Sequence, residues 1–71
     1  MEESTYKIIE LVGSSATSWE EAVNNAVNIA AESLRDLRIC EVTKLDTKIE
    51  NGKIVAYRAR VQLSFKYEKG Q

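Results

Sequence analysis

The sequence predicts an α+β chain in which three antiparallel strands and one helix follow in the order β-α-β-β. Three observations support this fold class. A segment rich in β-formers opens the chain, a helix start signal precedes apolar residues at helical spacing, and two strand patterns flank Asn51 and Gly52. At 71 residues the chain is expected to form one domain, residues 1–71, with the three-stranded sheet packed on the helix.

The first strand is predicted over residues 6–12, Tyr-Lys-Ile-Ile-Glu-Leu-Val, before a glycine and four small, mostly polar residues of loop character. Ser18 and Glu21 then match a capping box, in which the serine hydroxyl accepts from the glutamate amide and the carboxylate reaches back. A helix is therefore predicted from Ser18 to about Arg35. Its apolar stripe is formed by Trp19, Ala22, Val23, Ala26, Val27, Ala30 and Leu34.

The second half of the chain predicts a long β-hairpin. Residues 37–50 contain no Gly or Pro and end at Asn51 and Gly52, which together are the strongest short hairpin signal. Residues 55–67 then alternate between apolar and mostly polar side chains without a break. This alternation predicts a final strand with one apolar face.

The size of the chain and the length of the hairpin together predict self-association. A chain of 8.0 kDa buries little of its surface, and with one cysteine and no histidine it has neither a disulfide nor a zinc site to stabilise it. Strands of about fourteen residues span about 46 Å, whereas a helix of about eighteen spans about 27 Å. The apolar residues beyond the helix, which need cover from neighbouring subunits, are Val55, Tyr57, Phe65 and Tyr67.

Charge and composition argue against several classes of function. Ten basic and eleven acidic residues are scattered along the chain, so no positive stripe is available to follow a nucleic acid backbone. No apolar run approaches the length of a membrane span, and the acidic amino terminus resembles no export signal. The lone thiol favours a cytoplasmic location. No pair of titratable groups is placed for acid-base chemistry, so no enzymatic activity is expected.

The sequence resembles the dodecin family over residues 6–68. Three features carry the resemblance: the opening strand that ends in Val-Gly-Ser-Ser, the helix that starts Ser-Trp-Glu-Glu-Ala, and the hairpin strand Tyr-Arg-Ala-Arg-Val-Gln-Leu-Ser-Phe. The resemblance implies a hollow homododecamer that binds small ligands and performs no catalysis. Its flavin-binding members hold paired flavins between subunits and act as buffers or stores.

The resemblance also implies two ligand-binding positions. In flavin-binding members an aromatic residue of the second strand stacks on the flavin ring, and a glutamine of the third strand hydrogen-bonds the ring edge. These positions fall on Ile39 and Arg58, so the chain is placed in a branch without the stacking tryptophan. Because an aliphatic side chain only partly replaces ring stacking, binding of FMN or riboflavin is expected to be weakened or lost. Other members with aliphatic residues are described as calcium-associated, which gives a calcium-binding assembly or scaffold as the alternative.

Four side chains have both a structural and a functional interpretation. Trp19 is expected to lie in the core rather than to stack on a ligand, because it belongs to the apolar stripe. Cys40 is expected to pack inertly, since the chain has no histidine to activate it. Arg58 and Arg60 are expected to form a solvated or inter-subunit salt-bridge face, with an anion site as the alternative.

The ligands of any cation are not identifiable from the sequence. Oxygen atoms are available from Asp46, Glu50, Glu2 and Glu3, but no loop has the dense spacing of a calcium-binding hand. These residues are therefore expected to be solvated charges. A single carboxylate beside a symmetry axis is nevertheless repeated by each subunit, and such a site leaves no linear motif.

Overall fold

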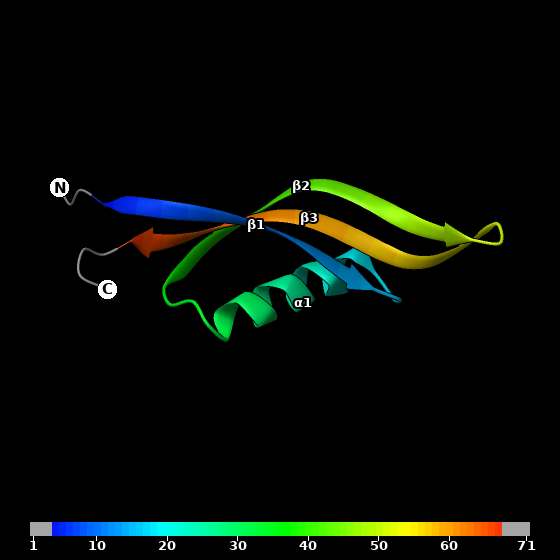
Figure 1. Cartoon of the computed structure of the whole chain (residues 1–71), viewed down its shortest axis with the longest axis horizontal. Coiled ribbons are helices and arrows are strands. Elements are labelled where there is room, and N and C mark those ends of the chain that lie inside the picture. Colours follow the sequence, from blue (N-terminus) through cyan, green and yellow to red (C-terminus); the bar gives the residue numbers. More distant parts are fainter. Residues whose placement is uncertain (1–3, 68–71) are drawn as a thin grey trace.

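The fold has one three-stranded sheet and one helix, in the predicted order β-α-β-β. In the computed structural model, which describes residues 4–67, the elements are β1 (Thr5–Ser15), α1 (Trp19–Ala31), β2 (Leu37–Glu50) and β3 (Lys53–Tyr67). β3 lies in the centre of the sheet and pairs antiparallel with both β1 and β2 (Figure 1). The predicted fold class is confirmed.

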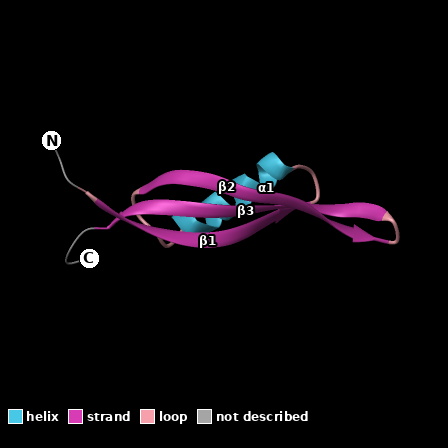
Figure 2. Ribbon diagram, turned by 90° about the horizontal axis from the view of Figure 1, so that it is seen from above, coloured by secondary structure: helices cyan, strands magenta, loops and turns pink. Residues whose placement is uncertain are grey.

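The helix covers only part of one sheet face. It packs mainly on β1 and β3 and touches β2 slightly, and Figure 2 shows it behind the middle of the strands. With thirteen residues α1 spans about 20 Å, whereas the fifteen residues of β3 span about 50 Å. The turn end of the β2–β3 hairpin therefore extends beyond α1, as predicted (Figure 1).

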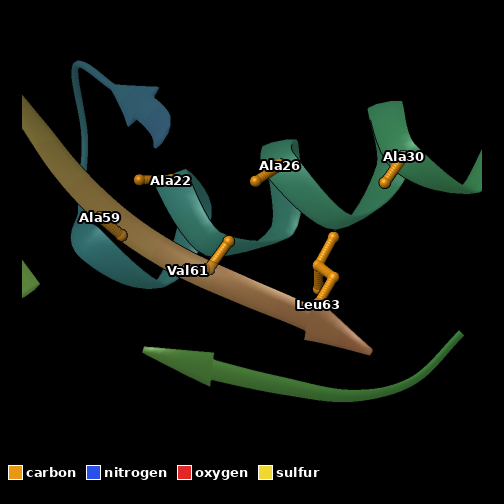
Figure 3. Close-up of a cluster of buried hydrophobic side chains, with 6 residues drawn as sticks. All are labelled: Ala22, Ala26, Ala30, Ala59, Val61 and Leu63. Atoms are coloured by element: carbon orange, nitrogen blue, oxygen red, sulfur yellow. The ribbon is translucent and has the colours of Figure 1, made fainter. Parts of the chain in front are cut away.

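The core is small and consists largely of alanine. Three alanines one helical turn apart on α1 face alternate residues of β3 (Figure 3). The buried residues are Ala22, Ala26, Ala30, Ala59, Val61 and Leu63. Small side chains let the helix backbone lie close to the sheet. At Gly13 of β1 the contact leaves no room for a side chain, because an added Cβ would lie 2.0 Å from the carbonyl oxygen of Ala22.

The start of α1 is held by two serines. Ser18 accepts from the Glu21 amide at 3.0 Å, which confirms half of the predicted capping box. The Glu21 carboxylate accepts from the buried hydroxyl of Ser15 instead of reaching back to Ser18. The Ser15 oxygen in turn accepts from the amides of Thr17 and Ser18. Ser15 thus ties the end of β1 to the first turn of the helix.

Two predicted boundaries are wrong. β1 continues through Gly13 to Ser15, because its last residues pair with β3 beneath the helix. α1 ends at Ala31 rather than at Arg35, since the amides of Glu32 and Ser33 bond only three residues back, to the carbonyls of Ile29 and Ala30, in a tightened closing turn. Asp36 then adopts a φ of 60°, which no α-helix accommodates.

The hairpin turn is confirmed, but the pairing behind it is irregular. Asn51 and Gly52 have φ angles of 54° and 75°, as a two-residue turn with two positive φ angles requires. The pairs next to the turn are Glu50 with Lys53 and Ile49 with Ile54. The register then shifts by one residue, so that Val55 has no partner on β2. A second shift leaves Thr43 of β2 unpaired. These two bulges offset one another, and a third shift, between Leu37 and Ile39, leaves Arg38 unpaired.

The isolated chain exposes more surface than a monomer of its mass. Its accessible surface is 5566 Å², whereas a folded monomer of 8.0 kDa exposes about 4450 Å². Of the apolar residues predicted to need cover, Val55 and Tyr67 are exposed, whereas Tyr57 and Phe65 are half-buried. No helix within residues 4–67 has the length and apolar character needed to cross a membrane.

Candidate functional site

The two predicted ligand-binding positions lie on the same face of the sheet. Directly opposed residues of neighbouring strands share a face; Ile39 pairs with Ser64, and Arg58 pairs with Asp46. These residues alternate with the buried residues of β3 and therefore point away from α1. We call this surface the open face; its β3 residues are Ala56, Arg58, Arg60, Gln62, Ser64 and Lys66.

Ile39 is an exposed apolar residue beside a second one. Its side chain is 64% exposed, and across Ser64 lies Ile8 of β1, which is 60% exposed. Ile39 also borders a hollow of about 170 Å³ at the β2 edge of the sheet. The pair offers apolar area to a ligand or to another subunit, but it has no aromatic ring on which a flavin would stack.

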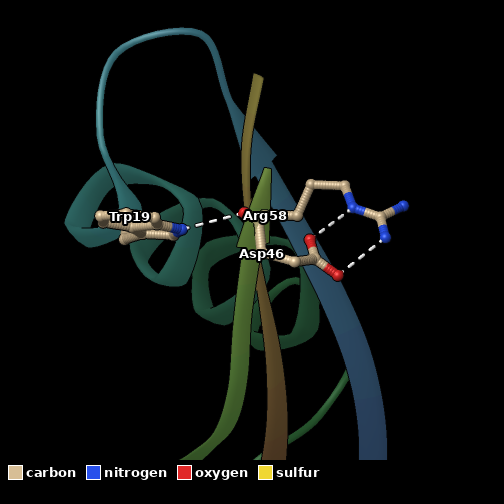
Figure 4. A network of polar contacts seen from close by, with 3 residues as sticks. All are labelled: Trp19, Asp46 and Arg58. Carbon is tan, nitrogen blue, oxygen red and sulfur yellow. Dashed lines mark hydrogen bonds and ion pairs between the residues drawn. The ribbon is translucent and has the colours of Figure 1, made fainter. Parts of the chain in front are cut away.

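Arg58 is engaged within its own chain. Its Nε and one terminal nitrogen donate to the two carboxylate oxygens of Asp46, at 2.7 and 2.9 Å (Figure 4). The hydrogen bond from Arg58 lowers the pKa of Asp46 below its usual value, and the same bond raises the pKa of Arg58. Both side chains remain half-exposed. Arg58 therefore forms a half-exposed salt bridge with Asp46 of its own chain.

Trp19 does not lie in the core, which corrects the prediction from its place in the apolar stripe. Its side chain is 39% exposed, and its Nε1 donates to the backbone carbonyl of Asp46 at 3.0 Å (Figure 4). Its ring meets the edge of Tyr57 at a centroid distance of 5.1 Å. As the first helical residue, Trp19 lies past the alanine core, where it contacts the hairpin. Within this chain, the contacts of Trp19 join the start of α1 to the hairpin.

Ile39 and Arg58 cannot line one pocket within a single chain. Six residues of β3 separate Arg58 from Ser64, the partner of Ile39, which corresponds to about 20 Å along the strand. A hollow of about 420 Å³ at the far end of β1 and β3 includes neither residue; it is lined by Lys7, Ser33, Leu34, Arg35, Phe65, Lys66 and Tyr67. Within one chain, a ligand would have to be about 20 Å long to contact both positions.

The carboxylates considered for a cation do not assemble into a site within this chain. Asp46 is bound by Arg58, and Glu50 lies 3.4 Å from the ammonium of Lys48. Glu2 and Glu3 fall outside residues 4–67. Over the described range, no group of three or more acidic or thiol side chains is close enough to hold a metal ion.

Cys40 packs against the alanine core from the edge strand, as predicted. Its side chain is partly buried, and this burial raises the pKa of the thiol. A raised thiol pKa leaves less of the reactive thiolate at neutral pH. Cys40 is therefore placed as a packing residue and not as a nucleophile.

Comparison with known proteins gives one consistent relationship. The sequence profile of the dodecin family matches residues 5–68. Calcium dodecin of Mycobacterium tuberculosis is 37% identical over 68 residues, which cover 96% of both chains. Its crystal structure, described as that of a calcium-chelating antigen with a novel calcium-binding site, has a TM-score of 0.83 at 40% identity and covers 96% of this chain and 97% of its own.

The dodecin of Streptomyces coelicolor has the same fold along its whole length. It superposes with a TM-score of 0.92 at 36% identity and covers 99% of this chain and 100% of its own. Dodecins are non-enzymatic binding proteins and are typically homododecameric. On the family match, these identities and the shared β-α-β-β architecture, the chain belongs to the dodecin family.

Proposed function

We propose that this chain forms a cytoplasmic homododecamer that binds a small ligand between subunits, with weakened affinity for flavin. It represents a branch of the family without tryptophan at the stacking position, where it has Ile39. The ligand site lies on the open face, and Ile39 and Arg58 come from different subunits.

The state of Arg58 is the observation that supports weak flavin binding. A guanidinium has donors only, and here two of them are bound to Asp46. A flavin edge that needs both a donor and an acceptor is poorly matched by this group. At the other position, Ile39 provides apolar contact without ring stacking. The residues present therefore do not fit the flavin-binding pattern of the family.

Fluorescence quenching on titration with riboflavin tests this proposal. The native protein is expected to quench weakly, whereas the Ile39→Trp/Arg58→Gln variant is expected to bind at least about tenfold more tightly, because it regains the stacking and the amide contact. Ile8→Trp is a matched control, since it adds an aromatic residue to the same face away from the implied position. Tight binding by the native protein, or an equal gain from Ile8→Trp, would contradict the proposal.

A second candidate is binding of calcium. It is favoured by the 37% identity to a calcium dodecin over 96% of both chains. Because no cluster of metal ligands lies within one chain over residues 4–67, the ion would be held by oxygens from several subunits at a symmetry axis. Binding of a small ligand on the open face and binding of calcium at a symmetry axis are compatible, because they are proposed at different places on the subunit surface.

Calorimetric titration with calcium separates this candidate from the first. Binding of calcium with heat release and a rise in the melting temperature would support it, since a ligand that binds the folded state stabilises that state. Magnesium is the control ion, because its stricter geometry disfavours a site tuned for calcium. No heat and no stabilisation with calcium would remove this function.

A further inference from the structure

We infer that Lys44, Arg58 and Arg60 form a binding site for an oxyanion, a phosphate or carboxylate group of the ligand, in which the Asp46 carboxylate is the internal occupant that the ligand displaces. We call these three cations the basic patch. The inference deepens the proposed function and rests on it, because Arg58 is one of its ligand-binding positions.

The basic patch follows from the register of β2 and β3. Lys44 pairs with Arg60 and Asp46 pairs with Arg58, so all four side chains share the open face. Opposed residues have Cβ atoms about 5 Å apart and diagonal neighbours about 7–8 Å apart. Three cations thus surround one carboxylate, although the whole chain has a net charge of −1.

The nearest acidic residues on this face lie beyond Arg60. Glu10 and Glu41 flank Gln62, which is two residues of β3, about 7 Å, from Arg60 and four residues, about 13 Å, from Arg58. On the turn side of the patch, Lys48 occupies the open face opposite Ala56 and is paired with Glu50. Asp46 is therefore the one carboxylate in the interior of the patch among the residues that the structure describes.

The contact between Arg58 and Asp46 shows what the site recognises. Two parallel bonds of 2.7 and 2.9 Å from the guanidinium to one carboxylate are the geometry with which arginine binds carboxylate and phosphate groups. Both side chains are half-exposed, so water and dissolved ions compete with each partner of the pair. A ligand oxyanion can therefore replace Asp46 at small cost, with Lys44 and Arg60 beside it to add charge.

The backbone beneath the patch is held from the opposite face. Trp19 donates to the Asp46 carbonyl and contacts Tyr57, the residue before Arg58 (Figure 4). Both strands of the patch are thus fixed to the start of α1, and only side chains need to move when a ligand enters. A preorganised backbone reduces the entropy lost on binding.

Calorimetric titration with inorganic phosphate tests the inference at an ionic strength of about 10 mM, where charge interactions are least screened. Asp46→Asn removes the competing charge and is expected to bind phosphate at least about fivefold more tightly than the native protein. In the Asp46→Asn background, Arg58→Gln and Arg60→Gln should each reverse this gain. Lys48→Gln is the matched control, a cation of the same strand and face that is paired with Glu50, and it should reduce the gain less than either arginine change does.

The outcomes separate the inference from the proposed function. If Asp46→Asn binds phosphate no better than the native protein, or if Lys48→Gln weakens binding as much as Arg60→Gln, the oxyanion site is wrong. Riboflavin binding by the Ile39→Trp/Arg58→Gln variant, together with a dodecameric mass, would still support the proposed function in that case. A phosphate gain without a dodecamer would retain the patch and reject the proposed function.

Discussion

Replacement of Gly13 by alanine is the sharpest test of how the helix lies on the sheet. The new Cβ would lie 2.0 Å from the Ala22 carbonyl oxygen and 3.1 Å from the Ala26 Cβ. Real Cβ atoms essentially never approach another heavy atom within 3.0 Å, so α1 must move away by at least about 1 Å. This movement separates all three core alanines of α1 from β3.

Overpacking of this kind costs about 1–3 kcal/mol, and in a chain of this size each kcal/mol lowers the melting temperature by about 4–8 °C. Gly13→Ala is therefore expected to melt roughly 4–24 °C below the native protein when circular dichroism is followed at a fixed protein concentration. Ser14→Ala, at the exposed neighbouring position of the same strand, should shift melting by less than a few degrees. A Gly13→Ala protein that melts with the native one would refute the close helix–sheet contact.

Three further predictions concern Trp19, Asp46 and Phe65. Trp19→Phe keeps a ring beside Tyr57 but loses the donor to the Asp46 carbonyl, so thermal melting should show a loss of about 0.5–1.5 kcal/mol; an unchanged melting curve would contradict the bond. Because Arg58 lowers the pKa of Asp46, the stability from this pair is present above the unfolded pKa of about 3.9 and is lost as pH falls through the folded pKa. Asp46→Asn should therefore lose less stability than the native protein when melting is followed from pH 5 to pH 2, and equal losses would count against the pair. Phe65→Asp places a charge on a half-buried apolar position near the end of β3 and should dissociate the assembly, as measured by size-exclusion chromatography. A variant that stays assembled would show that this end of β3 does not lie in an interface between subunits.

The order and type of the elements follow from the sequence because each has a strong local signal. Asn51 and Gly52 define the hairpin turn, and Ser18 begins the helix by capping it. The ends of β1 and α1 do not follow, since both depend on tertiary contacts. Ser15 stays in the strand because β3 pairs with it, and its hydroxyl then holds the first helical turn.

The pairing of Arg58 with Asp46 was beyond sequence reasoning for a specific reason. If the pairs next to the turn continued regularly from Ile49 and Ile54, Asp46 would lie opposite Tyr57, and Arg58 would face the other way. The unpaired Val55 shifts the register by one residue and brings the two charges together. Nothing in the local sequence predicts this bulge.

The position of Trp19 was missed for a related reason. Helical periodicity places it in line with the core alanines, but periodicity contains no information on where along the helix the sheet core ends. The tryptophan lies one turn before Ala22, against the hairpin that extends past the core. The polar contact of its Nε1 with β2 is the feature that joins the helix to the strand carrying Asp46.

Native mass spectrometry of the protein as purified tests the central claim most directly, because it reports the number of subunits and any retained ligand together. A homododecamer with weakened flavin binding should have a mass near 96 kDa, about twelve chains of 8.0 kDa, without flavin-sized increments. A monomer or dimer would contradict the assembly, and a dodecamer that retains flavin would contradict the proposed consequences of Ile39 and Arg58.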